Sequence, residues 1–185
     1  MKNEKREENK GGEKMKEVII MPKTIELKFE GPLEKEKFPL GDEYNCSGIY
    51  TVYAGTIIFF DGWDEPYDYE IHRLLYIGEA KDLSERLDIQ SEQPDELKHD
   101  KYEKWENQLE DEEILLFAVA KVSSKDREQA EAALIYYHHN VRKLELPYNK
   151  QNKKSFNYSD TIIKTSGYNE LLDDEFTVKG DSEVE

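Results

Sequence analysis

The chain has 185 residues, of which 37% are charged, and its formal net charge at pH 7 is −16. This length suits one domain of ordinary size with additional tails. The sequence has no apolar run long enough to span a bilayer and no apolar stretch typical of a signal peptide, and its single cysteine, Cys46, excludes an internal disulfide. We therefore expect a cytoplasmic protein without a membrane partner.

Residues 1–16 are almost entirely Lys, Glu, Asn, Arg and Gly, and they predict a disordered tail because they offer no apolar surface to bury. Farther along, apolar and β-branched patterns predict four strands: Thr24–Phe29, Gly48–Tyr53, Thr56–Phe60 and Ile71–Ile77. Gly31-Pro32 is expected to end the first of them. Ala54-Gly55 is expected to form a tight hairpin turn between the second and the third.

Helical spacing in the second half of the chain predicts three helices: one capped by Asp82, one over Asp95–Glu110, and one capped by Ser123 or Ser124. Apolar runs predict two further strands, Ile114–Val122 and Thr161–Lys164. Together these elements predict an α+β fold, in which a small antiparallel β-sheet of three or more strands is flanked by helices.

Two tripeptides carry the chemistry of this sequence. Gly48–Tyr50 reads Gly-Ile-Tyr and Tyr76–Gly78 reads Tyr-Ile-Gly, each on a predicted strand. Asp82–Arg86 follows as Asp-Leu-x-x-Arg, then Glu131 begins Glu-x-x-Leu-Ile, and Asn149 comes last. Two phenols, a guanidinium, a carboxylate and an amide are the groups needed to cut a phosphodiester with one metal ion.

In these motifs the chain resembles the GIY-YIG nuclease superfamily. The segment Tyr76–Leu87 is especially similar to the N-terminal cleavage domain of the bacterial excision-repair nuclease, and the long gap between the tripeptides is similar to that of GIY-YIG restriction enzymes. The resemblance covers about Ser47–Lys150. It implies a GIY-YIG-like fold and a divalent-metal-dependent endonuclease that hydrolyses DNA phosphodiester bonds with Mg²⁺ or Mn²⁺.

The resemblance also divides the chain into four parts: a disordered charged tail over 1–16, an N-terminal extension with a strand over 17–46, the nuclease domain over 47–150, and a C-terminal extension with an acidic tail over 151–185.

The resemblance gives each site residue a role. Tyr50 or Tyr76 would activate the attacking water and the other would orient it, provided that a metal ion and a guanidinium depress the pKa of a phenol. Arg86 would hold the scissile phosphate. Glu131 would be the sole protein ligand of the metal ion. Asn149 would tie the site together or contact phosphate. Read without the motif, the two tyrosines are half-buried aromatics of the sheet, Arg86 is a surface residue paired with Glu85 or Asp82, and Asn149 is a turn residue.

Three features depart from the family pattern. Glu79 stands where the excision-repair nuclease has Lys, and Gln90 stands where the family usually has His or Tyr. The loop Asp61–Glu70 carries five acidic residues and no cation. An alternative function is therefore a catalytically degraded module of the same fold that acts as an acidic protein-binding or regulatory protein. In an active enzyme, His138, on the helix of Glu131, could take the place of the missing base.

A nucleic-acid partner requires cations in spite of the acidic total. The segment Lys121–Lys154 contains eight Lys or Arg and four Asp or Glu, a local excess of +4. That excess is either a solvated face or a binding stripe. We expect DNA as the partner, with RNA as an alternative substrate, and a protein partner or a homodimer as the means of selecting a target.

Overall fold

The computed structural model describes residues 21–38, 40–59, 68–88, 96–149 and 154–181, with only the backbone of 96–100. The predicted tail over 1–16, residues 61–67 of the acidic loop, Gln90 and Lys150 lie outside these residues. Among the described residues, no helix combines the length and the apolar composition needed to cross a membrane.

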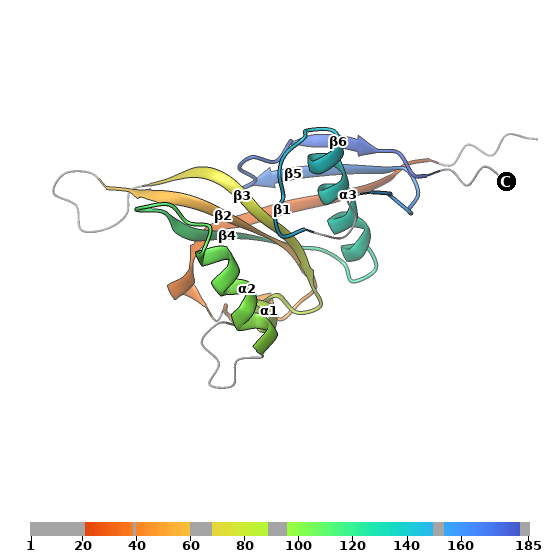
Figure 1. Ribbon diagram of the computed structural model, residues 1–185. Helices are drawn as coiled ribbons and strands as arrows, with labels where there is room; N and C mark the ends of the chain where they lie inside the picture. The colour runs from red at the N-terminus through yellow and green to blue at the C-terminus, as the bar shows by residue number, and fades with distance from the viewer. Residues whose placement is uncertain (1–20, 39, 60–67, 89–95, 150–153, 182–185) are drawn as a thin grey trace, which may run out of the picture.

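One curled sheet of six strands forms the framework (Figure 1). Its strands are β1 (Lys23–Glu34), β2 (Gly48–Ile58), β3 (Asp68–Ala80), β4 (Ile114–Lys121), β5 (Thr161–Gly167) and β6 (Glu175–Val178). They lie in the order β3-β2-β4-β1-β5-β6. The predicted α+β class is confirmed, but the sheet is mixed rather than antiparallel, because β5 pairs parallel to β1 while the other pairs are antiparallel.

Gly31-Pro32 and Ala54-Gly55, which were expected to end a strand and to form a turn, both lie inside strands. β1 continues through Gly31-Pro32, where the register with β4 shifts between Glu30 and Leu33. Proline is tolerated at such a bulge because no ladder hydrogen bond is needed from it. β2 continues through Gly55, so the predicted hairpin turn is wrong. A Cβ on Gly55 would lie 2.5 Å from the carbonyl oxygen of Glu70, so this glycine permits a close approach of β3.

The helices cover both faces of the sheet. α3 (Arg127–Asn140) lies on one face, near β5 and β6, while α1 (Leu83–Leu87) and α2 (Glu96–Glu106) lie on the other (Figure 1). Successive side chains of a strand point to opposite faces. Accordingly, Ile49 of β2 packs in the core under α3, whereas Tyr50 packs in a second core under α1 and α2. β2 is therefore buried on both faces, and its two cores meet the two helix layers.

The caps of α1 and α3 differ from each other. Asp82 caps α1 as predicted, since its carboxylate accepts a hydrogen bond from the backbone N–H of Glu85 at 2.9 Å. α3 begins one residue after Asp126, so the prediction of Ser123 or Ser124 as its cap is wrong. Ser123 instead donates its hydroxyl to the Asp126 carboxylate at 2.6 Å, and its carbonyl accepts the N–H of Arg127.

Candidate active site

A pocket of about 620 Å³ lies at β3, the edge strand of the sheet, where α1 and α2 from one face meet α3 from the other. It is lined by all five predicted site residues, Tyr50, Tyr76, Arg86, Glu131 and Asn149, and also by Glu79, Lys101, Lys104, Trp105, Ile135, Pro147 and Tyr148. The five predicted residues come from β2, β3, α1, α3 and the segment after α3. The fold thus brings together side chains that are up to 99 positions apart, from Tyr50 to Asn149.

The glycine of the second tripeptide explains how the two phenols meet. Gly78 of β3 lies opposite Tyr50 of β2 in the sheet register. A Cβ on Gly78 would lie 2.5 Å from Cε1 of Tyr76 and 2.6 Å from Cζ of Tyr50. Only a residue without a side chain leaves room for both rings, whose centroids are 5.7 Å apart.

The glycine of the first tripeptide has a parallel role for the guanidinium. A Cβ on Gly48 would collide with the side chain of Leu83 and lie 2.6 Å from the carbonyl oxygen of Ala120. Leu83 is fully buried at the start of α1. Because Gly48 lets α1 approach the sheet this closely, Arg86 on the same short helix reaches the pocket.

Asn149 is fixed by the backbone of β3. Its Oδ1 accepts the N–H of Ile77 at 3.0 Å, and its Nδ2 donates to the carbonyl of Ile77 at 2.5 Å. The side chain is buried and its amide imitates a peptide group facing the strand. These two bonds hold the backbone of Ile77, which lies between Tyr76 and Gly78. The role of Asn149 in the site stays a prediction.

The phenols have raised pKa values. Burial raises the pKa of Tyr50 well above its usual range, and Tyr76 raises it further while Arg86 lowers it. Burial also raises the pKa of Tyr76, as does Glu131, whereas a hydrogen bond from Tyr50 and the charge of Arg86 lower it. The sequence led us to expect depressed values, but desolvation outweighs the guanidinium. With the protein's own groups, both phenols are protonated at neutral pH, and Tyr50 donates its proton in a hydrogen bond to Tyr76.

The carboxyl group of Glu131 has an unusually high pKa. Burial raises its pKa to about 7, and the neighbouring charge of Glu79 raises it too, against the lowering effects of the Glu79 backbone N–H, Lys101 and Arg86. Glu79 forms an ion pair with Arg127, which is buried on α3 one turn before Glu131. Glu79 is the residue that departs from the family pattern. Its negative charge is offset by Arg127, a cation on α3.

The carboxylates of the pocket determine whether it could hold a divalent metal ion. The described part of the chain contains no group of three or more His, Cys, Asp or Glu side chains that could hold an ion. Among the carboxylates of the described residues, only Glu131 and Glu79 line the pocket. Mg²⁺ is often held by one or two carboxylates, with waters and substrate phosphates completing its shell, so this sparse set fits an ion that binds together with substrate. Glu128, three residues before Glu131 on α3, is exposed and contacts Arg127.

Sequence reasoning missed the contribution of α2. Lys101, Lys104 and Trp105 line the pocket, yet none of them belongs to the motifs of the sequence. The four-residue spacing of Lys101 and Trp105 places them on one helical face and could have indicated the lysine.

Two predictions about α3 and its neighbourhood change with the structure. His138 is fully buried in the core, edge-on to Phe176, and is not part of the pocket lining. Burial lowers its pKa to about 4. The cations between Lys121 and Lys154 do not all form one stripe, because Arg127 pairs with Glu79 and Arg142 pairs with Asp173.

Comparison of the chain with protein-family models, with curated proteins and with solved structures gives no match. The assignment of a function therefore depends on the pocket and its side chains.

Proposed function

We propose that the protein is a divalent-metal-dependent endonuclease of GIY-YIG type that hydrolyses phosphodiester bonds in DNA. One observation carries the proposal: the five residues singled out by their order in the sequence, Tyr50, Tyr76, Arg86, Glu131 and Asn149, line one pocket. A set of unrelated surface and core residues would have no reason to converge from two strands, from helices on both faces of the sheet and from the segment after α3.

The charge of the pocket supports an anionic substrate. Three cations line it, Arg86, Lys101 and Lys104, against the two carboxylates of Glu79 and Glu131. Arg127 offsets Glu79 from behind the pocket wall. The chain as a whole has a net charge of −16 and therefore repels anions. The local positive excess makes the pocket a place where a ligand that carries phosphate is attracted.

The burial of the phenols supports a division of roles between them. Tyr76 is partly exposed and faces the pocket, while Tyr50 is 1% exposed and hydrogen-bonds to Tyr76 from behind. Tyr76 then orients the attacking water or a phosphate oxygen, and Tyr50 orients Tyr76. Arg86 binds the phosphate and stabilises the charge that develops on it. Asn149 keeps the backbone under Tyr76 in place.

Glu131 is the residue that would hold Mg²⁺ or Mn²⁺, with Glu79 beside it. When bound there, such an ion supplies Lewis-acid stabilisation of the departing oxygen. Because the pKa of Glu131 is raised to about 7, its carboxylate is only partly ionised in neutral solution and gains from a nearby cation.

A plasmid-nicking assay with Mn²⁺ tests the proposal, run at low salt so that weak electrostatic binding is retained. We expect nicking by the unaltered protein and a loss of nicking in the Glu131→Ala variant with no loss of folded structure. Cleavage that survives in Glu131→Ala would refute the assignment of the metal ligand.

The alternative is a module of the same fold without catalysis, for which the charge of Glu79 near Glu131 is the specific supporting observation. Absence of nicking, together with a melting temperature that Mn²⁺ does not change, would favour this alternative. RNA carries the same phosphodiester, so the assay is repeated with a single-stranded RNA in place of the plasmid.

A further inference from the structure

We propose that Lys101 binds the substrate phosphate beside Arg86, so that cations from two different helices hold one anion. This inference rests on the proposed function and names a substrate-binding residue that the motifs of the sequence do not include. α2, on which Lys101 lies, has no place in either tripeptide or in the Arg, Glu and Asn that follow them.

The position of Lys101 carries the proposal. The residue is half-buried and lines the pocket, and its Nζ lies 5.7 Å from the ring centroid of Tyr76. The negative face of an aromatic ring attracts a cation at this distance. The tyrosine expected to face the attacking water thus has a cation directly above its ring.

The electrostatic neighbours of Lys101 are the groups of the candidate site. Burial lowers the pKa of Lys101, and Arg86 lowers it as well, while Glu131 and Glu79 raise it. In turn, Lys101 and Arg86 both lower the pKa of Glu131. The ammonium group therefore lies within electrostatic reach of the guanidinium and of the carboxylate that would hold the metal ion.

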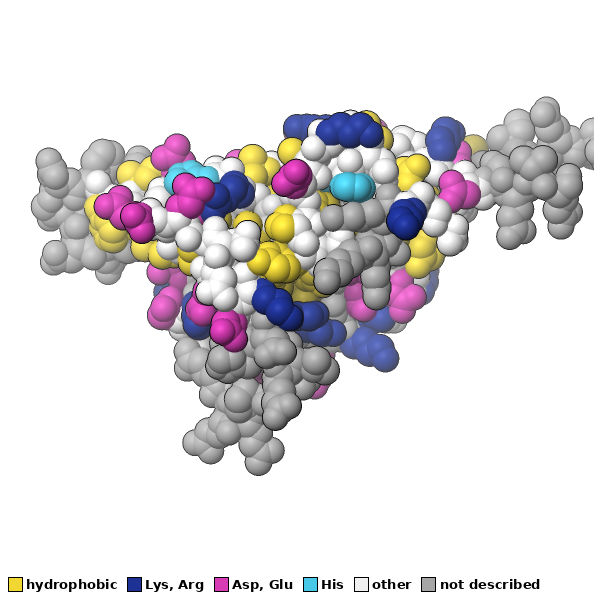
Figure 2. Space-filling model, in the orientation of Figure 1, with side chains coloured by type: hydrophobic (Ala, Val, Ile, Leu, Met, Phe, Trp, Pro, Cys, Tyr) yellow, Lys and Arg dark blue, Asp and Glu magenta, His cyan; other side chains and the backbone are white. Residues whose placement is uncertain are grey.

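No carboxylate among the described residues forms a salt bridge with Lys101 or Arg86. Two cations that repel each other at a partly buried position cost free energy unless an anion joins them. The space-filling view shows basic side chains beside an apolar patch between α2 and α3 (Figure 2). A phosphate entering here would neutralise both charges.

Aromatic packing keeps α2 in the position that this role needs. Trp105, one turn after Lys101, packs against Tyr76 with ring centroids 5.3 Å apart and against Tyr102 at 5.1 Å. Trp105 and Tyr102 also contact Phe117 of β4. Because these rings are buried in the core under α2, the helix holds Lys101 over Tyr76 by packing alone.

The test measures binding of a short single-stranded oligothymidylate by fluorescence anisotropy, without divalent metal, over a series of salt concentrations. The variants are Lys101→Met, which keeps the aliphatic stem, Lys101→Arg, which keeps the charge, and Lys28→Met, an exposed lysine of β1, as the control. Melting temperatures are recorded for all of them, and Lys101→Gln replaces Lys101→Met if the latter does not fold.

We expect Lys101→Met to weaken binding about tenfold or more, as for the loss of a hydrogen bond to a charged group. The slope of log affinity against log salt should fall by about 0.7, which is the contribution of one phosphate contact on a single strand. Lys101→Arg should retain both quantities, and Lys28→Met should change neither. A residue that only stacked on Tyr76 would change the melting temperature without changing the salt slope.

The result that overturns the inference is a Lys101→Met variant whose affinity and salt slope match those of Lys28→Met, or an unaltered protein that does not bind the oligonucleotide. Failure of the nuclease proposal is separate, because it would appear as binding that depends on Lys101 without any nicking in Mn²⁺.

Discussion

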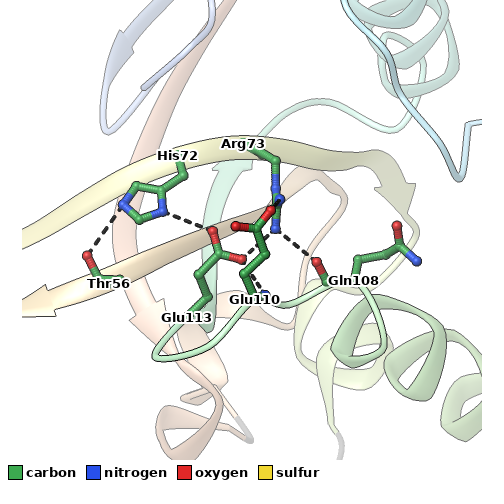
Figure 3. Close-up of polar contacts among 6 residues, drawn as sticks. All are labelled: Thr56, His72, Arg73, Gln108, Glu110 and Glu113. Atoms are coloured by element: carbon green, nitrogen blue, oxygen red, sulfur yellow. Dashed lines mark hydrogen bonds and ion pairs between the residues drawn. The ribbon is translucent and has the colours of Figure 1, made fainter.

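β3 carries two charged sites of opposite kinds. At the first, near the middle of the strand, Arg73 contacts Glu110 and Glu113, each at 2.5 Å, and donates to the carbonyl of Gln108 (Figure 3). His72 lies 2.9 Å from Glu113. Farther along the same strand, Tyr76 and Glu79 line the pocket. There Arg86 and Lys101 form no salt bridge within the described residues.

This difference separates a structural site from a candidate functional one. Around Arg73 each charge has an opposite charge in contact, and the cluster joins β3 to the segment between α2 and β4 (Figure 3). In the pocket, Arg86 and Lys101 act on each other and on Glu131 without a salt bridge, and Glu131 has a raised pKa. Charged groups that lack direct partners and have shifted pKa values are typical of sites where a ligand completes the balance.

The largest expected effect is on the nicking rate, when Arg86 and Arg73 are replaced by Met in separate variants. Arg86→Met should lower the nicking rate by about a hundredfold or more, as for the loss of a group that stabilises the transition state. Its melting temperature should change little because Arg86 has no ion pair among the described residues.

Arg73→Met is the matched control for this experiment. It should lower the melting temperature and keep most of the nicking activity, because Arg73 lies outside the pocket lining. An Arg73 variant that loses as much activity as Arg86→Met would remove the distinction between the two charged sites.

A second effect, of intermediate size, concerns the carboxylates around Arg73. The side chain of Glu113 is 4% exposed and that of Glu110 is 74% exposed. Glu113→Ala should lower the free energy of unfolding by about 1–3 kcal/mol, because it leaves His72 and Arg73 without their buried partner. Glu110→Ala should cost less than about 1 kcal/mol, since an exposed pair is screened by water. Equal losses in urea unfolding of the two variants would contradict this description.

The smallest effect is a difference in pH dependence between Glu113 and Glu131. Burial alone would raise the pKa of Glu113, but the backbone N–H of Glu110, with His72 and Arg73, lowers it. Its contribution to stability is therefore present above its unfolded pKa of about 4.3 and is lost as the pH falls through its folded value. Glu131 acts in the opposite direction, because its pKa is raised to about 7 and the folded state binds its proton more tightly.

Between about pH 4.3 and the folded pKa of Glu131, stability should thus fall as the pH rises. Glu131→Gln should remove this decrease, and Glu113→Gln should remove the acid-induced loss, when unfolding is followed from pH 3 to pH 8 in EDTA. If the free energy of unfolding depended on pH in the same way in both variants, the two carboxylates would not differ as described.

The sequence predicted the candidate site better than the sheet. Tyr50, Tyr76 and Arg86 were identified from short motifs whose glycines, Gly48 and Gly78, are required by close contacts at the site itself. Such local constraints are visible in a sequence, because the residue type and the geometry depend on each other. The pocket contains these residues, although their chemical roles remain predictions.

The strand pairing could not be predicted in the same way. β5 lies beside β1 and parallel to it because of contacts between segments more than 100 residues apart, and no local pattern encodes them. β6 has only four residues and was missed. Gly55 was interpreted as a turn because glycine permits both a turn and a close backbone approach, and only the neighbouring strand decides between them.

The two hydrogen bonds of Asn149 have a consequence beyond the pocket. β3 forms one border of the sheet, and an open border is a template on which another chain can add a strand. Asn149 already occupies the N–H and the carbonyl of Ile77, so an incoming strand would have to displace a buried side chain to pair there. Copies of this chain that joined through strand addition would meet less resistance at the opposite border, β6.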